Sequence, residues 1–357
     1  MRILVVGAGP AGLYFSYLAK RAHPAWDIRV VEQNRADSTF GFGVVFSDRA
    51  LEFLRGDDPQ TYDAITPHME QWVDLTVVHR GTPVLIDGIG FSAIGRLRFL
   101  QLMQQRAASA GIVPEYETKL SSLDGYDLVV GADGVNSAVR ASRDFGTSIT
   151  HLTNKFAWYG TPDLFKTLTQ TFVSNEHGSF NAHHYRHSPG MSTFVAECDA
   201  GTWQRAGFAS MDQTTTIAYL EKLFGHRLVS NKSVWRSFPN VRNRKYFSGN
   251  AVLIGDALRT AHFSIGSGTR LAMEDAIALA RALQGHAVPE ALQAFESARR
   301  PIVEKLVAAA DASGQWYENF AEHMKLAPRE FAWSYIQRSG RIDPERLRKI
   351  SPRFVEG

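Results

Sequence analysis

The segment ILVVGAGPAGL, from Ile3 to Leu13, reads as a buried strand, a glycine-rich turn and the start of a helix. A continuous apolar run is typical of a strand covered on both faces, and helical periodicity follows it. Three glycines fit the pattern G-x-G-x-x-G, which allows a tight turn, close approach of a pyrophosphate, and packing of helix on strand. The segment therefore predicts a dinucleotide-binding unit, whose loop comprises Gly7, Gly9, Pro10, Ala11 and Gly12.

A carboxylate stands at the distance from this loop that the pattern requires. Glu32 follows a second apolar strand, Ile28 to Val31, about 20 residues after the last glycine. Such a side chain can accept hydrogen bonds from both hydroxyls of an adenosine ribose and repels a 2′-phosphate. NAD and FAD enzymes share this arrangement, so these residues leave the choice of dinucleotide open.

The composition is that of a folded globular protein. The chain has 357 residues, 44% of them hydrophobic and 21% charged, with a net charge of +3, and this small, dispersed charge argues against nucleic-acid binding. One cysteine, Cys198, excludes an intrachain disulfide and favours a reducing compartment. No apolar stretch approaches the roughly 20 residues of a membrane span. We therefore expect a cytoplasmic protein with no nucleic-acid or membrane partner.

Two later segments repeat the order of strand and turn. Asp133-Gly134 follows an apolar run and could, taken alone, be an ordinary turn. Asp256 follows the strand Val252 to Ile254, and a helix starts near Gly268. Ligands of open α/β sheets lie beyond the carboxyl ends of the strands, so Asp256 is placed to bind a polyol, and the helix directs its positive end to the same place. FAD contains a ribitol and NAD does not.

The order of these motifs resembles that of single-component FAD-dependent aromatic hydroxylases of the para-hydroxybenzoate hydroxylase type. Three longer segments look like the flavin hydroxylases that act on salicylyl-CoA and anthraniloyl-CoA, and the violacein-pathway tryptophan hydroxylase is a more distant likeness. The resemblance covers nearly the whole chain. It rests on Gly7 to Gly12 with Glu32, Asp133-Gly134, Gly255-Asp256, FESARRP (295–301), FGFGVVFSD (40–48), AIGRLRFLQLM (93–103) and AHFSIGSGTRLAMEDAIALARAL (261–283).

The resemblance implies an α/β fold with a Rossmann-like, three-layer FAD-binding domain. This domain would be discontinuous, made of residues 1–150 and 240–300. Residues 151–239, with parts of 50–90, would form an inserted substrate domain, and alternation such as STFVAEC (192–198) predicts a mostly antiparallel sheet there. Residues 301–357 would form a helical C-terminal segment.

The same resemblance implies FAD as cofactor and NADH or NADPH as co-substrate. Glu32 would hold the adenosine ribose, Arg96 would contact the FAD, and Asp256 would bind a ribityl hydroxyl. Asp133 would lie near both nucleotides. Because we find no second G-x-G-x-x-G motif, NAD(P)H is expected to bind without a Rossmann fold of its own. The pyrimidine edge of the isoalloxazine would face Gly266, Ser267, Gly268 and Thr269.

In this family the flavin hydroperoxide formed with O2 attacks an electron-rich aromatic carbon, so the pocket must exclude water. A group that accepts the phenol proton raises the electron density of the ring. His262 and Phe263 stand where many relatives have a proline pair. We take His262 as the candidate polar catalytic residue and Phe263 as an apolar wall, with a merely exposed loop histidine as the alternative. Arg259 replaces a histidine usual in the family, and its role stays open.

The segment NAHHYRHS, 181–188, is the candidate substrate strand. It has no carboxylate or thiolate nearby in sequence, so we predict no metal site. Because side chains alternate along a strand, His183 or Tyr185, on the opposite side from His184, would line the pocket. Phe46, in the glycine-rich segment 40–48, is the third substrate candidate, since the corresponding loop borders the active site in the family; a simple bend is the alternative.

The sequence thus predicts a monooxygenase that hydroxylates a small aromatic substrate with O2, as a monomer or homodimer. A benzoyl-CoA-type thioester such as salicylyl-CoA is the first substrate hypothesis. The alternatives are a free aromatic or indolic acid and, from another class, a non-catalytic FAD-fold binding protein. The arginines of RIDPERLRKISPRF, 341–354, are either a solvated helix face or a contact for CoA phosphates.

Overall fold

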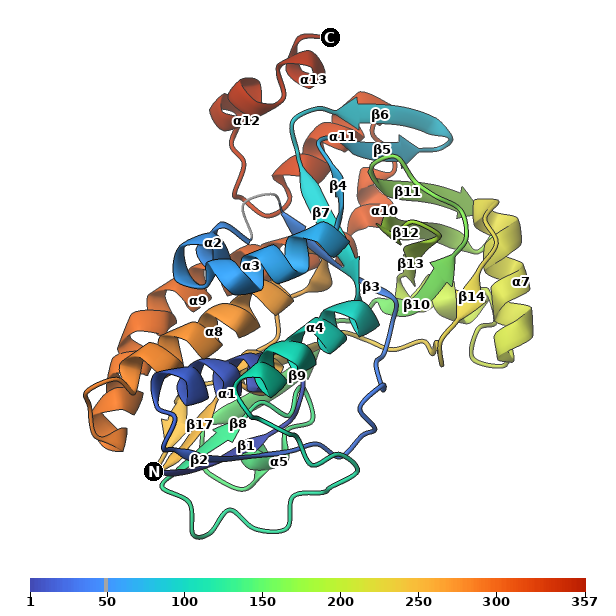
Figure 1. Ribbon diagram of the computed structural model, residues 1–357. Helices are drawn as coiled ribbons and strands as arrows, with labels where there is room; N and C mark the ends of the chain where they lie inside the picture. The colour runs from blue at the N-terminus through green and yellow to red at the C-terminus, as the bar shows by residue number, and fades with distance from the viewer. Residues whose placement is uncertain (48–50) are drawn as a thin grey trace.

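The computed structural model describes residues 1–47 and 51–357. Asp48, the last residue of FGFGVVFSD, and Ala50, at the start of the 50–90 region, lie outside the described residues. Figure 1 shows a helix-covered sheet that carries the N-terminus and, beside it, a second, larger sheet. The α/β fold class predicted from the sequence is confirmed.

The first sheet has the strand order β16-β17-β8-β1-β2. The strands β17, β8, β1 and β2 run parallel, and β16 pairs antiparallel at the edge. Because helices cover this sheet, its central strands are mostly apolar, as in the buried run from Ile3 to Val6, whereas the edge strand β2 carries the exposed Asp27 and Arg29. Their bounds are β1 Arg2–Val6, β2 Asp27–Val31, β8 Leu128–Gly131, β16 Phe247–Ser248 and β17 Ala251–Leu253.

The second sheet has seven strands in the order β14-β10-β13-β12-β11-β5-β6. It is antiparallel except for the pair β11 and β5. Its strands are β5 Leu75–His79, β6 Thr82–Ile86, β10 Lys155–Thr161, β11 Leu168–Asn175, β12 Gly178–Ser188, β13 Met191–Cys198 and β14 Val229–Ser230. The second sheet therefore combines strands that precede β8 in the sequence, β5 and β6, with strands that follow it.

Two small sheets connect the larger ones. One has the order β3-β7-β4, from Gly43–Ser47, Phe91–Gly95 and Glu70–Trp72. The other pairs β9, Thr147–His151, with β15, Pro239–Asn243. This second pair joins the points where the chain leaves the first sheet region and returns to it.

The helix α9, Val288–Glu318, corrects one expected boundary. Pro301 lies inside it, and buried residues such as Val303 and Val307 continue its apolar face, so the division placed at 300/301 falls within one helix. Tertiary packing offsets the cost of the proline. The other helices are α1 Pro10–Ala22, α2 Glu52–Asp57, α3 Pro59–Ile65, η2 Thr66–His68, α4 Arg96–Ser109, α5 Ala138–Ala141, α6 Ala200–Arg205, α7 Gln213–Phe224, η3 Gly255–Ala257, η4 Phe263–Ile265, α8 Gly268–Ala282, α10 Phe320–His323, α11 Pro328–Gln337, α12 Pro344–Ile350 and α13 Pro352–Glu356.

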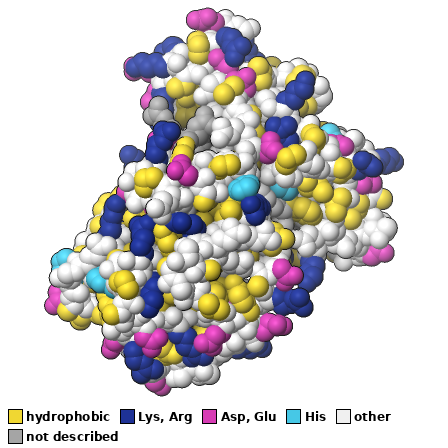
Figure 2. All heavy atoms as spheres, in the orientation of Figure 1, with side chains coloured by type: hydrophobic (Ala, Val, Ile, Leu, Met, Phe, Trp, Pro, Cys, Tyr) yellow, Lys and Arg dark blue, Asp and Glu magenta, His cyan; other side chains and the backbone are white. Residues whose placement is uncertain are grey.

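Basic and acidic side chains are interspersed over the face of the molecule that Figure 2 shows. Within residues 1–47 and 51–357, no helix has both the length and the apolar character needed to cross a bilayer.

Candidate functional site

Three glycines shape the turn between β1 and α1, for different reasons. Gly7 has a φ of +104°, which favours glycine, and a Cβ at Gly12 would lie 2.0 Å from the Gly7 carbonyl oxygen. The fold itself therefore requires these two glycines. A Cβ at Gly9 would meet nothing within 4 Å. The space beside Gly9 is open to a ligand.

A pocket of about 510 Å³ lies at the carboxyl ends of β1 and β2. Gly9, Pro10 and Glu32 are among the residues that line it. The Glu32 carboxylate accepts hydrogen bonds from the backbone N–H of Ala8 at 3.0 Å and of Asn34 at 2.9 Å. These bonds fix the orientation of the one acidic side chain that the motif assigns to a ribose.

Asp133 and Gly134 line the same pocket. The Asp133 carboxylate accepts hydrogen bonds from Ser137 Oγ at 2.5 Å and from the Ala138 amide at 2.6 Å, so it also holds the start of α5. A Cβ at Gly134 would meet nothing within 4 Å. Asp133 therefore stabilises the start of α5, and Gly134 leaves the backbone beside it accessible to a ligand.

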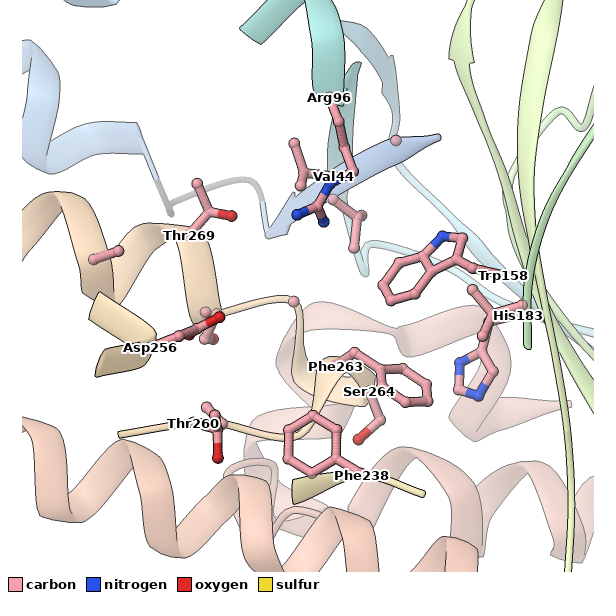
Figure 3. Close-up of a pocket in the computed structure, with 18 of the residues that line it drawn as sticks. Val44, Arg96, Trp158, His183, Phe238, Asp256, Thr260, Phe263, Ser264 and Thr269 are labelled. Carbon is pink, nitrogen blue, oxygen red and sulfur yellow. The ribbon is translucent and has the colours of Figure 1, made fainter. Parts of the chain in front are cut away.

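A second cavity, of about 400 Å³, continues from the first. The two share seven residues, among them Gly9, Arg96 and Thr269. Asp256 lines the second cavity, and no hydrogen bond to its carboxylate is found among the described residues. Figure 3 shows Asp256 and Thr269 on one side of this space and Arg96 reaching into it from α4. The Asp256 side chain is exposed to the cavity. Desolvation by the surrounding protein raises its pKa, and the charges of Arg259 and Arg96 oppose that rise.

The segment Gly266 to Thr269 forms the entry to α8 and lines this cavity. Gly266 has a φ of +59°, and a Cβ at Gly268 would meet nothing within 4 Å. The N-terminus of the 15-residue helix α8 lies here, and its free N–H groups favour an electron-rich partner.

A buried ion-pair cluster supports the turn that carries Asp256. Asp275, which is 0% exposed, lies 2.6 Å from Arg259 Nη1 and accepts hydrogen bonds from Arg299 Nε at 3.0 Å and from the Gly255 amide at 3.0 Å. Arg259 also donates to the Gly255 carbonyl at 2.8 Å. Arg259, whose role the sequence left open, thus helps to hold the Gly255-Asp256 turn. Arg299 is the residue of the segment FESARRP that pairs with Asp275.

Aromatic side chains form the far wall of the second cavity. Phe263 lies 4.9 Å from Phe156 and 5.8 Å from Trp158, measured between ring centroids, and Phe238 lies nearby at 6.0 Å. Phe263 lines the cavity, as proposed from the sequence. The sequence analysis missed the other three. Phe156 and Trp158 are two residues apart on β10, so strand alternation could have placed them on one face. No pattern in the sequence pointed to Phe238.

Neighbouring histidines of β12 point to opposite faces of the sheet, as expected for a strand. His183 and Tyr185 line the cavity, whereas His184 faces the other side, where its Nε2 lies 2.8 Å from Thr171 Oγ1. His183 Nε2 lies 3.3 Å from the carboxylate of Glu197, which is 2% exposed. Burial, with a smaller effect of Arg338, lowers the pKa of His183 to about 3. The imidazole is therefore neutral at physiological pH.

His262 does not line the cavity, which corrects its expected position. It is 3% exposed, and its Nδ1 lies 2.8 Å from Ser264 Oγ. The short helix η4 brings Phe263 and Ser264 to the cavity instead. Burial lowers the pKa of His262 to about 4, with Glu197 opposing. His262 thus lies behind the cavity wall, where it contacts Ser264, Phe263 and Phe238. The sequence analysis did not single out Ser264.

Phe46 is also placed differently from the expectation. It is 0% exposed and packs edge-on against Phe99 of α4, with 6.0 Å between ring centroids. Its neighbours Val44 and Val45 on β3 line the cavity. The glycine-rich pattern of residues 40–48 does not predict which side chains of the short strand β3 face α4. Phe46 is therefore a core residue.

The two cavities fit an extended dinucleotide. Open glycine positions flank both of them, a fixed carboxylate lies at one end, and an unpartnered carboxylate with a helix N-terminus lies at the other. Glu32, Asp133, Asp256 and the loop residues are thus brought together, although they are far apart in sequence. No group of three or more His, Cys, Asp or Glu side chains suited to a metal ion occurs in the described part of the chain.

Comparison with known proteins agrees with this geometry. The FAD binding domain family matches residues 100–310. Salicyloyl-CoA 5-hydroxylase of a Streptomyces species is 42% identical, over 95% of this chain and 70% of its own length. The 3-hydroxy-4-methyl-anthranilyl-[aryl-carrier protein] 5-monooxygenase of Streptosporangium sibiricum is 37% identical over 89% of each chain. Protodeoxyviolaceinate monooxygenase of Chromobacterium violaceum is 34% identical over 96% of each chain.

A solved structure supports the fold. That of 2-methyl-3-hydroxypyridine-5-carboxylic acid oxygenase aligns with a TM-score of 0.75 at 19% identity, covering 97% of this chain and 95% of that one. The family match spans more than half of the chain, and the relatives above are matched over most of their length. The resemblance drawn from the sequence motifs is confirmed. The chain belongs to the FAD binding domain family and is a flavin-dependent aromatic hydroxylase.

Proposed function

We propose that the substrate of this hydroxylase is a benzoyl-CoA-type thioester, such as salicyloyl-CoA, and that NADH or NADPH supplies the electrons. The observation that carries the proposal is the aromatic chamber formed by Phe156, Trp158, Phe238 and Phe263 at the end of the α8-facing cavity. An aryl ring held there would lie against apolar side chains that limit the access of water. The 42% identity to a salicyloyl-CoA hydroxylase supports the thioester.

The FAD is assigned to the continuous pair of cavities. Glu32 would hold the adenosine ribose, Gly9 would admit the pyrophosphate, and Asp256 would accept a hydrogen bond from a ribityl hydroxyl. Arg96 lines both cavities and would contact the cofactor between its ends. The N–H groups of Gly266 to Thr269 would stabilise negative charge on the reduced ring. When bound, FAD supplies the electron transfer from NAD(P)H to O2.

His183 is proposed as the polar group that binds the reacting ring. Its Nε2 is directed to Glu197, and no hydrogen bond to its Nδ1 is found among the described residues. Because the imidazole is neutral, Nδ1 can accept a hydrogen bond from a ring hydroxyl or amino group and so raise ring electron density. Ser264, held by His262, would serve as a second polar contact.

A panel of substrates tests the proposed reaction. Salicyloyl-CoA, anthraniloyl-CoA, the free acids and tryptophan-derived indolic acids are each mixed with the flavoprotein and NADH or NADPH, and mass analysis detects an added oxygen. We expect oxygen addition to the thioesters and far slower reaction of the free acids. Faster turnover of an indolic acid would favour the second candidate, to which the violacein-pathway relative points. Purified protein that fails to bind FAD would contradict both.

Replacing His183 by Ala is expected to uncouple the reaction. FAD content should stay unchanged, while product formed per NAD(P)H oxidised falls and hydroxylation slows about 10-fold, as for loss of one hydrogen bond to the reacting group. His184→Ala, on the opposite face of β12, is the matched control and should stay coupled. Because burial lowers the pKa of His183 to about 3, the wild-type profile should show no acidic limb from this residue above about pH 5. Full coupling in His183→Ala would exclude the role.

A further inference from the structure

A third cavity, of about 630 Å³, adjoins the aromatic chamber. The two have Phe91, Ser264 and Arg338 in common. The walls of the third cavity come from the β6–β7 connection, from η4 and the start of α8, and from the chain between α11 and α12. Nothing in the FAD assignment or in the aromatic chamber accounts for this space.

The third cavity is strongly basic. Four arginines line it, namely Arg270, Arg338, Arg341 and Arg346, and no acidic side chain is among its lining residues in the described part of the chain. Arg270 pairs with Glu274 at 2.7 Å, and Arg346 donates to the Arg341 carbonyl at 3.2 Å. The remaining lining includes apolar side chains such as Ile89, Ile336, Ile342 and Ile350.

Arg341 lines this cavity together with three other arginines. No hydrogen bond or ion pair of its guanidinium is found among the described residues. The Arg341 side chain is exposed at the cavity wall; partial desolvation there, followed by the charges of Arg270 and Arg346, lowers its pKa. Of the four arginines, only Arg270 has a carboxylate partner among the described residues. The other guanidinium groups repel each other, and their arrangement suits several phosphate oxygens, to which arginine donates paired hydrogen bonds.

We propose that this basic cavity binds the phosphate groups of the coenzyme A part of the substrate, with the pantetheine arm passing Phe91 and Ser264 into the aromatic chamber. The inference rests on the proposed thioester substrate and gives it a binding site. Several guanidinium groups match the diphosphate and 3′-phosphate of free CoA better than the single phosphodiester of a carrier-protein arm. Apolar residues between the arginines suit the methyl groups and methylenes of pantetheine.

The arginines on the α12 side provide the test. The double variant Arg341→Gln/Arg346→Gln removes two of the four charges, and Arg348→Gln, exposed on the same helix and outside the cavity lining, is the matched control. We expect the KM for salicyloyl-CoA to rise about 100-fold in the double variant, as for two lost charged contacts, with kcat and FAD content nearly unchanged. The control should behave like wild type.

Substrates that lack one or all of the phosphates of CoA show which phosphate groups the cavity binds. In wild type, 3′-dephospho-salicyloyl-CoA should bind more weakly than salicyloyl-CoA, and salicyloyl-pantetheine more weakly still. In the double variant, which keeps Arg270 and Arg338, the differences in KM among the three should become much smaller. Equal KM values for all three in wild type would overturn the proposal, as would a double variant whose defect is confined to the KM for NAD(P)H. A preference for salicyloyl-phosphopantetheine on a carrier protein over salicyloyl-CoA would also overturn it.

Direct binding keeps this inference distinct from the proposed reaction. Titration calorimetry with CoA on the FAD-loaded protein requires no turnover. If no thioester is hydroxylated, yet wild type binds CoA and the double variant does not, then the reaction is wrong and the cavity assignment stands. If thioesters are hydroxylated but CoA binding is the same in wild type and the double variant, the cavity assignment is wrong.

Discussion

A Gly9→Val variant is expected to fold like the wild type and to purify without flavin. Gly9 has φ −75° and ψ 179°, an extended conformation that valine adopts readily, and a Cβ there meets no protein atom within 4 Å. The valine side chain would instead occupy the space of the pyrophosphate at the N-terminus of α1. Loss of two charge-assisted hydrogen bonds costs about 3 kcal/mol, or about 100-fold in FAD affinity. Flavin absorbance and FAD titration measure this loss.

Two other glycines make the result interpretable. Gly190→Val adds the same atoms at an equally open, exposed glycine in the turn between β12 and β13, so its FAD content should match wild type. Gly12→Ala places a methyl group 2.0 Å from the Gly7 carbonyl oxygen and should lower the melting temperature of the apoprotein itself. Stoichiometric FAD in Gly9→Val would remove this loop from the cofactor site.

Asp275→Ala is expected to produce the largest loss of stability. The variant leaves Arg259 and the Gly255 amide without their carboxylate partner, and Arg299 retains only Glu274, 3.1 Å away. Removing one partner of a buried ion pair costs about 3–5 kcal/mol, because the remaining charge is buried and unpaired. Since the cluster also fixes the Gly255-Asp256 turn, FAD should bind more weakly. Urea unfolding of the apoprotein and FAD titration measure the two effects.

An exposed ion pair offers the comparison. Asp311 lies 2.5 Å from Arg242, and its side chain is 45% exposed. Solvent screens such a pair, so Asp311→Ala should change the free energy of unfolding by less than about 1 kcal/mol. If Asp275→Ala were no more costly than Asp311→Ala, the ion-pair cluster would have no special part in holding the turn.

The motif residues could be predicted because each depends on local chemistry. A glycine at positive φ, a carboxylate that ends a strand and a helix that begins after a glycine turn are visible within a few residues of sequence. Strand alternation likewise separated His183 and Tyr185 from His184. The order of these elements carried the family resemblance, which in turn implied FAD and aromatic hydroxylation.

The errors arose where side-chain direction depends on packing between distant segments. Phe46 packs against Phe99 of α4, and His262 lies behind Phe263 because the short helix η4 turns its side chain away from the cavity. Phe238 and Arg338 reach the chamber from remote segments. No local pattern in the sequence records these directions.

The sequence by itself determined the dinucleotide-binding loop, the family and the type of reaction, because backbone geometry and ligand chemistry constrain single residues there. The tertiary structure decided which side chains face the substrate and brought the arginines at 270, 338, 341 and 346 around one cavity. From the sequence alone, a solvated helix face was one of two interpretations of the last two. In the structure Arg341 precedes α12 and Arg346 lies on it. Their shared position depends on how α11 and α12 pack beside η4 and α8, and such long-range packing is set by the whole fold.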